Sequence, residues 1–264
     1  MARQHLGQHF LADAGWRERI TNALRASAAD VWLEIGAGHG EMTAVLARRS
    51  AKVIAVEMDL RLLERLLGLA QELPNVEVIR GDVLALDLGR VIGPRRVRVY
   101  GNLPYYITSP ILHRLFEHAD RLSTIDVVVQ LEVAERLRAR PGRREYGYLS
   151  VLAQFYAQPE ILLRIPPGAF RPRPKVTSAL VSLRIPGNRG QLGITDEAEF
   201  LEFVKACFAQ KRKTLLNNLR RMVGEERAQE VLRRAGLRRT ARAEQLNLAE
   251  LAALYKHRRQ GSVD

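Results

Sequence analysis

The sequence predicts an α/β protein in which a mostly parallel sheet is followed by a small all-α C-terminal domain. Three observations carry this prediction. Short apolar runs alternate with longer stretches of helical periodicity, a glycine-rich turn joins the first such run to the first helix, and strand-like runs stop after residue 186. Alternating strands and helices form a parallel sheet whose two faces are both covered by helices.

Five buried strands are expected first, each a short run of apolar and β-branched residues. They are expected at 31–35, 52–56, 76–79, 97–100 and 126–130. Helical periodicity occupies 41–49, 59–73, 111–118 and the residues after 131. Two later β-like segments, 160–165 and 176–185, are expected to close the sheet as an antiparallel pair.

A change in composition predicts a linker at 186–190, which contains proline, glycine and asparagine. We therefore expect one domain over 1–186 and a second over 187–264. Helical periodicity runs from 195 to 257, and the second segment has 16 Lys and Arg against 10 Asp and Glu. The sequence predicts a helical, basic C-terminal domain.

The overall charge favours a polyanionic partner. The 264 residues carry a formal net charge of +13, which suits a nucleic acid or an anionic membrane, although a charge that serves only solubility is the simpler alternative. No 18-residue stretch lacks a charged side chain, and residues 1–16 contain no apolar run of signal-peptide length. The single cysteine, Cys207, excludes an internal disulfide and a cysteine-based zinc site. We expect a cytoplasmic protein with no membrane partner and Cys207 as an apolar helix residue.

The glycine-rich turn follows the first strand and opens the first helix. Glycines 36, 38 and 40 fall at relative positions 1, 3 and 5, whereas a dinucleotide fingerprint has them at 1, 3 and 6. Glu41 occupies that sixth position, where a carboxylate disfavours a pyrophosphate. Glu34 ends the strand and favours a cationic ligand with an amino-acid end, such as S-adenosylmethionine. A tight turn without a ligand is the alternative.

Two further acidic residues follow the next two strands. Glu57 is placed to accept the two ribose hydroxyls of a nucleoside, and Asp82 to accept the exocyclic amine of its adenine. Each acid alone is more often a solvated loop or helix-cap residue. Three acids at three successive strand ends indicate a ligand at the carboxyl edge of the sheet.

The fourth strand leads into Asn102-Leu103-Pro104-Tyr105, the most specific signal in the chain. An adenine amine is a poor nucleophile because its lone pair is delocalised into the ring. The Asn102 oxygen and a backbone carbonyl near Leu103 are expected to accept its two N–H groups, while Tyr105 stacks on the base. This chemistry needs no metal. The alternative is an ordinary Asn–Pro turn.

A base in a structured RNA has to be swung out of its stack to reach such a pocket, so a second aromatic is expected. Phe170, in a proline-rich loop before a late strand, is the candidate. A plain core role for Phe170 is the alternative.

These motifs together resemble the KsgA family of small-subunit ribosomal RNA adenine dimethyltransferases. The residues that carry the resemblance occur in family order: 7–11, 34–43, Glu57, 81–82, 102–105, the 170–176 pattern Phe-x-Pro-x-Pro-x-Val, and the tail segment 208–219. The resemblance implies a class I, Rossmann-like methyltransferase domain over 1–186 and an RNA- or ribosome-binding domain over 187–264.

The resemblance also implies an activity. A monomeric chain is expected to dimethylate two adjacent adenosines in a hairpin loop near the 3′ end of 16S ribosomal RNA during assembly of the 30S particle, releasing S-adenosylhomocysteine. His9 and Leu11 are implied to close over the cofactor, Gly36 and Gly38 to lie under its methionine end, and Asn102 to touch cofactor and base. Position 9 is often Asn in this family, so the contact made by His9 is left open.

Two basic clusters are expected to contact RNA phosphates and to make the affinity sensitive to salt. The first comprises Arg136, Arg138, Arg140, Arg143 and Arg144, and the second comprises Lys211, Arg212, Lys213, Arg220 and Arg221. A solvated helix face is the alternative for each cluster.

Other functions remain open at this point. A macrolide-resistance methyltransferase of large-subunit RNA shares the catalytic motifs but is not expected to carry the 208–219 segment. A DNA adenine methyltransferase shares the Asn–Pro–Tyr logic. Leu103 and the 208–219 segment argue against this alternative. An RNA-binding assembly factor with secondary catalysis is the rival from another class.

Overall fold

The computed structural model describes residues 9–210 and 213–259, and these form two compact units. The first, here called the sheet unit, comprises 9–134 and 158–185. The second, here called the helical unit, comprises 135–157 together with the described residues from 186 onward. The helical unit therefore includes a segment, 135–157, that the boundary expected from the sequence assigns to the first domain.

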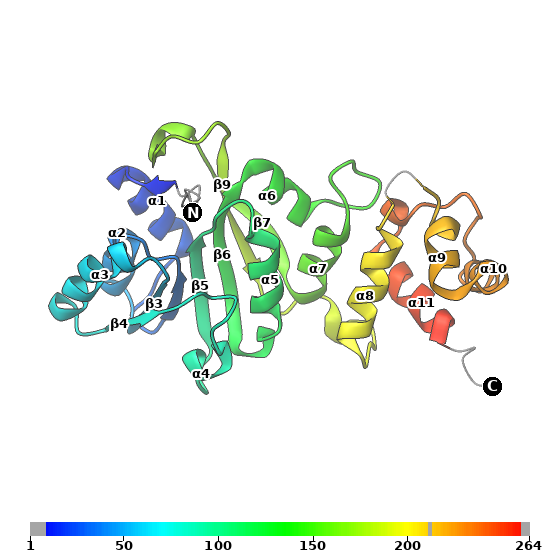
Figure 1. Ribbon diagram of the computed structural model, residues 1–264, viewed down its shortest axis with the longest axis horizontal. Helices are drawn as coiled ribbons and strands as arrows, with labels where there is room; N and C mark the ends of the chain where they lie inside the picture. The colour runs from blue at the N-terminus through cyan, green and yellow to red at the C-terminus, as the bar shows by residue number, and fades with distance from the viewer. Residues whose placement is uncertain (1–8, 211–212, 260–264) are drawn as a thin grey trace, which may run out of the picture. The chain divides into compact units, whose positions relative to one another are not determined.

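The sheet unit contains a seven-stranded sheet in the order β4-β3-β2-β5-β6-β9-β7 (Figure 1). Its strands are β2 (Val31–Ile35), β3 (Lys52–Glu57), β4 (Val76–Arg80), β5 (Val97–Asn102), β6 (Leu122–Gln130), β7 (Gln158–Ile165) and β9 (Ser178–Arg184). The five strands from β4 to β6 are parallel, and β9 runs antiparallel to both β6 and β7. The predicted α/β class, the five parallel strands and the antiparallel closing pair are confirmed.

The helices of the sheet unit lie largely where periodicity predicts them. They are α1 (Ala14–Leu24), α2 (Glu41–Ala47), α3 (Leu60–Glu72), α4 (Leu88–Ile92) and α5 (Thr108–Phe116), and α6 (Leu131–Arg138) spans the border between the units. The α1 and α4 helices were not predicted. Asp13 and Asp59 cap α1 and α3, because each side chain accepts a backbone N–H of the first turn at 3.0 Å.

One face of the sheet packs against α1 and α2. Trp32, Tyr100 and Leu180 face Ile20 of α1 and Leu46 of α2 in one buried cluster. Residues that alternate with them along the strands, such as Leu33 and Val99, are equally buried, so both faces are covered. Full burial of such side chains contributes about 1.5–3 kcal/mol each, which fixes the positions of the strand ends.

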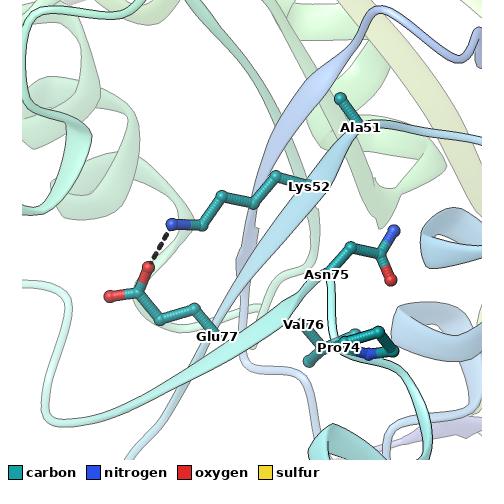
Figure 2. Close-up of a pocket in the computed structure, with 6 residues that line it drawn as sticks. All are labelled: Ala51, Lys52, Pro74, Asn75, Val76 and Glu77. Atoms are coloured by element: carbon teal, nitrogen blue, oxygen red, sulfur yellow. Dashed lines mark ion pairs between the residues drawn. The ribbon is translucent and has the colours of Figure 1, made fainter.

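An ion pair and side-chain hydrogen bonds hold the amino ends of β3 and β4 together (Figure 2). Lys52 forms a 2.5 Å ion pair with Glu77, and the Asn75 amide donates to the carbonyls of Ala47 and Ser50 at 2.8 and 3.0 Å. A shallow hollow lies between these residues. It is at the opposite end of the strands from the glycine-rich turn.

The N-terminal segment forms a strand that the sequence did not predict. β1 (Phe10–Leu11) pairs antiparallel with β8 (Phe170–Arg171) in a separate two-stranded sheet. The Ala12 N–H donates to the Ala169 carbonyl at 3.0 Å. Residues 10–12, which precede α1, are therefore fixed against the proline-rich loop before β9.

The helical unit comprises α7 (Tyr148–Tyr156), α8 (Glu197–Cys207), α9 (Leu215–Val223), α10 (Glu225–Arg234) and α11 (Leu248–Arg259). No strand occurs in the described residues after 186, as predicted. Phe155, Phe200 and Tyr255 form an aromatic core with ring separations of 5.3 and 5.5 Å. The Tyr146 hydroxyl donates to the Leu246 carbonyl at 2.9 Å, which ties segment 135–157 to the tail.

The single cysteine, Cys207, is the last residue of α8 and has the apolar environment that the sequence predicts for it. Cys207 is fully buried, and burial raises the pKa of its thiol.

None of the helices in the described ranges combines the length and the apolar character needed to cross a bilayer.

Candidate active site

The glycine-rich turn is hydrogen-bonded to the carboxyl end of β3. Gly36 has φ +69° and donates its N–H to the Val56 carbonyl at 2.9 Å. No heavy atom lies within 4 Å of the position that a Cβ on Gly36 would occupy, so this glycine faces open space. Gly38 has φ +60°, and a Cβ there would lie 3.1 Å from the Phe10 ring. Both positions require the left-handed backbone that glycine adopts without strain.

Two cavities open at this edge of the sheet. The first, here called the turn cavity, is lined by Phe10, Leu11, Glu34, Gly36, Ala37, Gly38, Glu41, Met42, Tyr100 and Asn102. The second, here called the loop cavity, is lined by His9, Phe10, Gly36, Glu57, Asn102, Leu103, Pro104 and Tyr105. They share Phe10, Gly36 and Asn102, so the glycine-rich turn and the Asn102–Tyr105 loop border the same space.

Glu34 places a buried carboxyl group beside the turn cavity. Its side chain is 2% exposed, and no described residue bonds its Oε2 atom. Burial, followed by repulsion from Glu41 and Glu57, raises the pKa of Glu34 to about 8. A buried carboxyl with an open oxygen is suited to a cationic group, which would favour its ionised form.

Glu57 is held rigidly at the end of β3. Its Oε2 atom accepts the Gly38 N–H at 2.8 Å, and its Oε1 atom accepts the N–H groups of Met58 and Asp59 at 2.8 Å each. Asp82 lies beside it in the chain fold, because the Gly81 N–H donates to the Glu57 carbonyl at 3.0 Å. Asp82 itself is exposed, accepts the Leu84 N–H at 2.9 Å and lines neither cavity.

The Asn102–Tyr105 loop leaves the end of β5. The Asn102 Nδ2 atom donates to the His9 carbonyl at 2.7 Å, and the Leu103 N–H donates to the Val128 carbonyl at 3.1 Å. Tyr105 is half-buried, and its hydroxyl shares a 3.0 Å hydrogen bond with the Ser178 Oγ atom. Burial raises the pKa of the Tyr105 phenol, which stays neutral near pH 7.

The N-terminal segment contributes residues to both cavities. The His9 Nδ1 atom bonds the Pro172 carbonyl at 2.7 Å, and its ring lies 5.7 Å from the Tyr105 ring with a tilt of 31°. A carbonyl only accepts, so this contact requires a proton on Nδ1. Leu11 is buried and lines the turn cavity.

Phe170 lines neither of the two cavities. It is fully buried in the cluster that contains Ile20, Leu24 and Leu180. This burial agrees with the core role that the sequence left open for Phe170, and its stacking role stays a prediction.

Two side chains received no role from the sequence. Phe10 lines both cavities, and its ring packs edge-on against His39 at 4.6 Å. Tyr106, next to the stacking candidate Tyr105, is 62% exposed. The exposed aromatic beside a polar motif was a signal that could have been used, whereas the position of Phe10 depends on the pairing of β1 with β8.

The first basic cluster and the described residues of the second belong to the helical unit. All five arginines of the first cluster are exposed, and the same holds for Lys213, Arg220 and Arg221 of the second. Arg220 lies 3.9 Å from Glu225. Lys211 and Arg212 lie outside the described residues. Among the described residues, no three His, Cys, Asp or Glu side chains gather as a metal site.

Comparison with known sequences points to one family. The sequence profile described as ribosomal RNA adenine dimethylase matches residues 1–260. A relative from Koribacter versatilis, named ribosomal RNA small subunit methyltransferase A, is 41% identical over 97% of this chain and 94% of its own length. A relative of the same name from Acidobacterium capsulatum is 43% identical over 95% of this chain and 89% of its own.

Solved structures agree in fold. A dimethyladenosine transferase from Plasmodium falciparum superimposes with a TM-score of 0.79 at 25% identity, covering 93% of this chain and 96% of that one. The 23S ribosomal RNA methyltransferase ErmE gives a TM-score of 0.68 at 28% identity, covering 94% and 98%.

Proposed function

The chain belongs to the ribosomal RNA adenine dimethylase family, and from that premise we propose its substrate and its site residues. It methylates the N6 amines of two adjacent adenosines in a 3′-terminal hairpin loop of 16S ribosomal RNA. The product is N6,N6-dimethyladenosine. The observation that carries the proposal is the shared cavity border of Gly36 and the Asn102–Tyr105 loop.

The names of the relatives support the small-subunit substrate over the large-subunit alternative. The two relatives at 41% and 43% identity are named small-subunit methyltransferases, whereas ErmE, a 23S enzyme, is 28% identical. An RNA-binding assembly factor with secondary catalysis remains the rival, and the experiment below separates the two.

The residues of the turn cavity fit S-adenosylmethionine. Glu34 offers an unpartnered buried oxygen to a cationic group, and Gly36 leaves the space of a side chain free. When bound, S-adenosylmethionine supplies a methyl group on a positively charged sulfur, and S-adenosylhomocysteine leaves with the electron pair of the broken bond. Glu57 accepts the ribose hydroxyls, Asp82 the adenine amine, and His9 and Leu11 close over the cofactor.

The loop cavity positions the target base. Asn102 and the Leu103 carbonyl accept the two N–H groups of the adenine amine, which concentrates the lone pair on the nitrogen that attacks the methyl carbon. Tyr105 stacks on the flipped ring. One proton leaves the nitrogen in each transfer, and alignment of nitrogen, carbon and sulfur supplies the rest of the rate enhancement.

The RNA is held by exposed cations of the helical unit, which contact phosphates and read shape rather than sequence. The chain acts as a monomer on the assembling 30S particle in the cytoplasm. The net charge of +13 and the exposed arginines support this partner.

The test is methylation of small-subunit particles from a strain that lacks the enzyme, read by mass spectrometry of the RNA. Wild-type chain should yield dimethyladenosine at two adjacent positions. Asn102→Ala should lower the transfer rate by about 100-fold or more while RNA binding is kept. Retained transfer removes Asn102 from its role. Wild-type binding without transfer favours the assembly factor, and methylation of large-subunit RNA alone favours the macrolide-resistance type.

A further inference from the structure

We infer that the main-chain carbonyl of His9 positions the Asn102 amide and thereby makes an amide, rather than a carboxylate, necessary at position 102. The carbonyl binds the nitrogen end of the side chain and leaves the oxygen end for the target amine. This inference rests on the proposed function, because it concerns the amine acceptor of that reaction.

The contact that carries the inference is the 2.7 Å hydrogen bond from Asn102 Nδ2 to the His9 carbonyl. A carbonyl has no proton to donate, so the oxygen of the amide cannot take the place of the nitrogen. The side chain is thus held in one of its two orientations. Asn102 borders both cavities, so the direction of its oxygen decides which group the site presents between them.

The His9 carbonyl can orient the Asn102 amide because the residues that follow it in the chain are held in place. Phe10 pairs with Arg171 in the β1–β8 ladder, and the His9 ring bonds the Pro172 carbonyl at 2.7 Å. The Arg17 guanidinium donates to the Leu11 carbonyl at 2.8 Å. Residue 9 therefore holds its position through its own ring contact and through the contacts of residues 10 and 11, independently of the Asn102 side chain.

An aspartate at position 102 would place two acceptors against each other. A carboxylate oxygen facing the His9 carbonyl has no proton for a hydrogen bond, and the lost bond is replaced by repulsion. Protonation removes the conflict, because a carboxylic acid donates its O–H to the carbonyl and keeps its other oxygen as an acceptor. The proton therefore restores the arrangement that the amide has at every pH.

The experiment is the pH profile of single-turnover methyl transfer by Asn102→Asp, divided by the wild-type rate at each pH from 5 to 9. We expect a ratio of about 0.01 or less at pH 8.5. It should rise by about tenfold per pH unit as the pH falls toward the carboxyl pKa. Asn102→Ala, which has neither donor nor acceptor, should show a low ratio without this rise. An Asn102→Asp rate near that of wild type at pH 8.5, or a ratio that does not change with pH, overturns the inference.

A second measurement uses only the wild-type chain. Hydrogen exchange by NMR should find one slowly exchanging proton on the Asn102 side-chain amide, identified by its loss in Asn102→Ala. If both protons exchange as fast as those of a solvated amide, the inference is wrong even when the Asp variant fails to fold. Failure of the proposed function has a different signature, since wild-type chain would then give no dimethyladenosine.

Discussion

The carboxyl edge of the sheet and the surface of the helical unit differ in how they hold ionisable side chains: acids are buried at the first, and basic residues are exposed on the second. Glu34 and Glu57 are each 2% exposed, and Glu57 is bonded by three backbone N–H groups. Arg138, Arg140 and Arg143 are exposed. Buried charges act singly and resist screening, whereas exposed charges are weak alone and add up against a polyanion.

The largest expected effect tests the buried side of this comparison. Glu57→Ala should weaken S-adenosylmethionine binding by about 30-fold or more, because truncation of a buried, hydrogen-bonded charge costs about 2 kcal/mol or more. Calorimetric titration measures the Kd. Lys52→Ala is the matched control, since it removes a charge from the other end of the same strand (Figure 2) and should leave the Kd unchanged. Equal affinity of wild type and Glu57→Ala refutes the ribose assignment.

Glu34 should make stability and cofactor affinity depend on pH in opposite directions. Its folded-state pKa of about 8 lies above the ordinary value of 4.5. The contribution to stability is therefore present below pH 4.5 and is lost as the pH rises through 8. Denaturant unfolding between pH 5 and 9 should show this loss for wild type and a flatter profile for Glu34→Gln.

Cofactor binding provides the complementary check on Glu34. A bound cation favours the carboxylate, so binding at pH 7 should release a proton and strengthen as the pH rises. The observed enthalpy should then vary with the ionisation enthalpy of the buffer in wild type but not in Glu34→Gln. A buffer-independent enthalpy in both proteins places the cationic group elsewhere.

The exposed side of the comparison predicts smaller, additive effects. Replacing Arg138, Arg140 and Arg143 together by Gln should reduce the slope of log Kd for RNA against log salt by about 2 to 3, if each contacts one phosphate. Arg233→Gln with Arg234→Gln is the control, because both arginines pair with Glu230. An unchanged slope in the triple variant leaves the first cluster as a solvated surface.

The smallest expected effect is that of removing the Tyr105 hydroxyl, because the proposed role of Tyr105 depends on its aromatic ring and not on a charge. Tyr105→Phe keeps the stacking surface and loses the 3.0 Å bond to Ser178, so we expect a stability loss of about 1 kcal/mol and a transfer rate within a few-fold of wild type. Tyr105→Ala, which removes the stacking surface, should greatly lower the transfer rate. A large rate loss in Tyr105→Phe would instead give the hydroxyl a part in the reaction.

Features set by local pattern were predictable from the sequence. The strands predicted at 31–35 and 97–100, the turn at Gly36 and the loop at Asn102 follow from apolar runs, glycine spacing and a short motif, and the second strand extends two residues further, to Asn102. The sheet edge brings these together because parallel strands end on the same side.

Features set by distant packing were not predictable. The β1–β8 pairing joins residues about 160 positions apart, and no periodicity marks a two-residue strand. The burial of Phe170 follows from this pairing and from its contacts with the α1 cluster. Segment 135–157 groups with the tail through bonds such as Tyr146 to Leu246, which composition alone does not reveal.

The lone buried thiol makes this chain convenient for spectroscopy. Cys207 is enclosed in the helical unit and its high pKa keeps it unreactive toward thiol reagents. A cysteine introduced at an exposed position such as 140 would then be the only site that a maleimide dye modifies. One fluorophore can therefore report the docking of RNA on that surface without prior removal of a native cysteine.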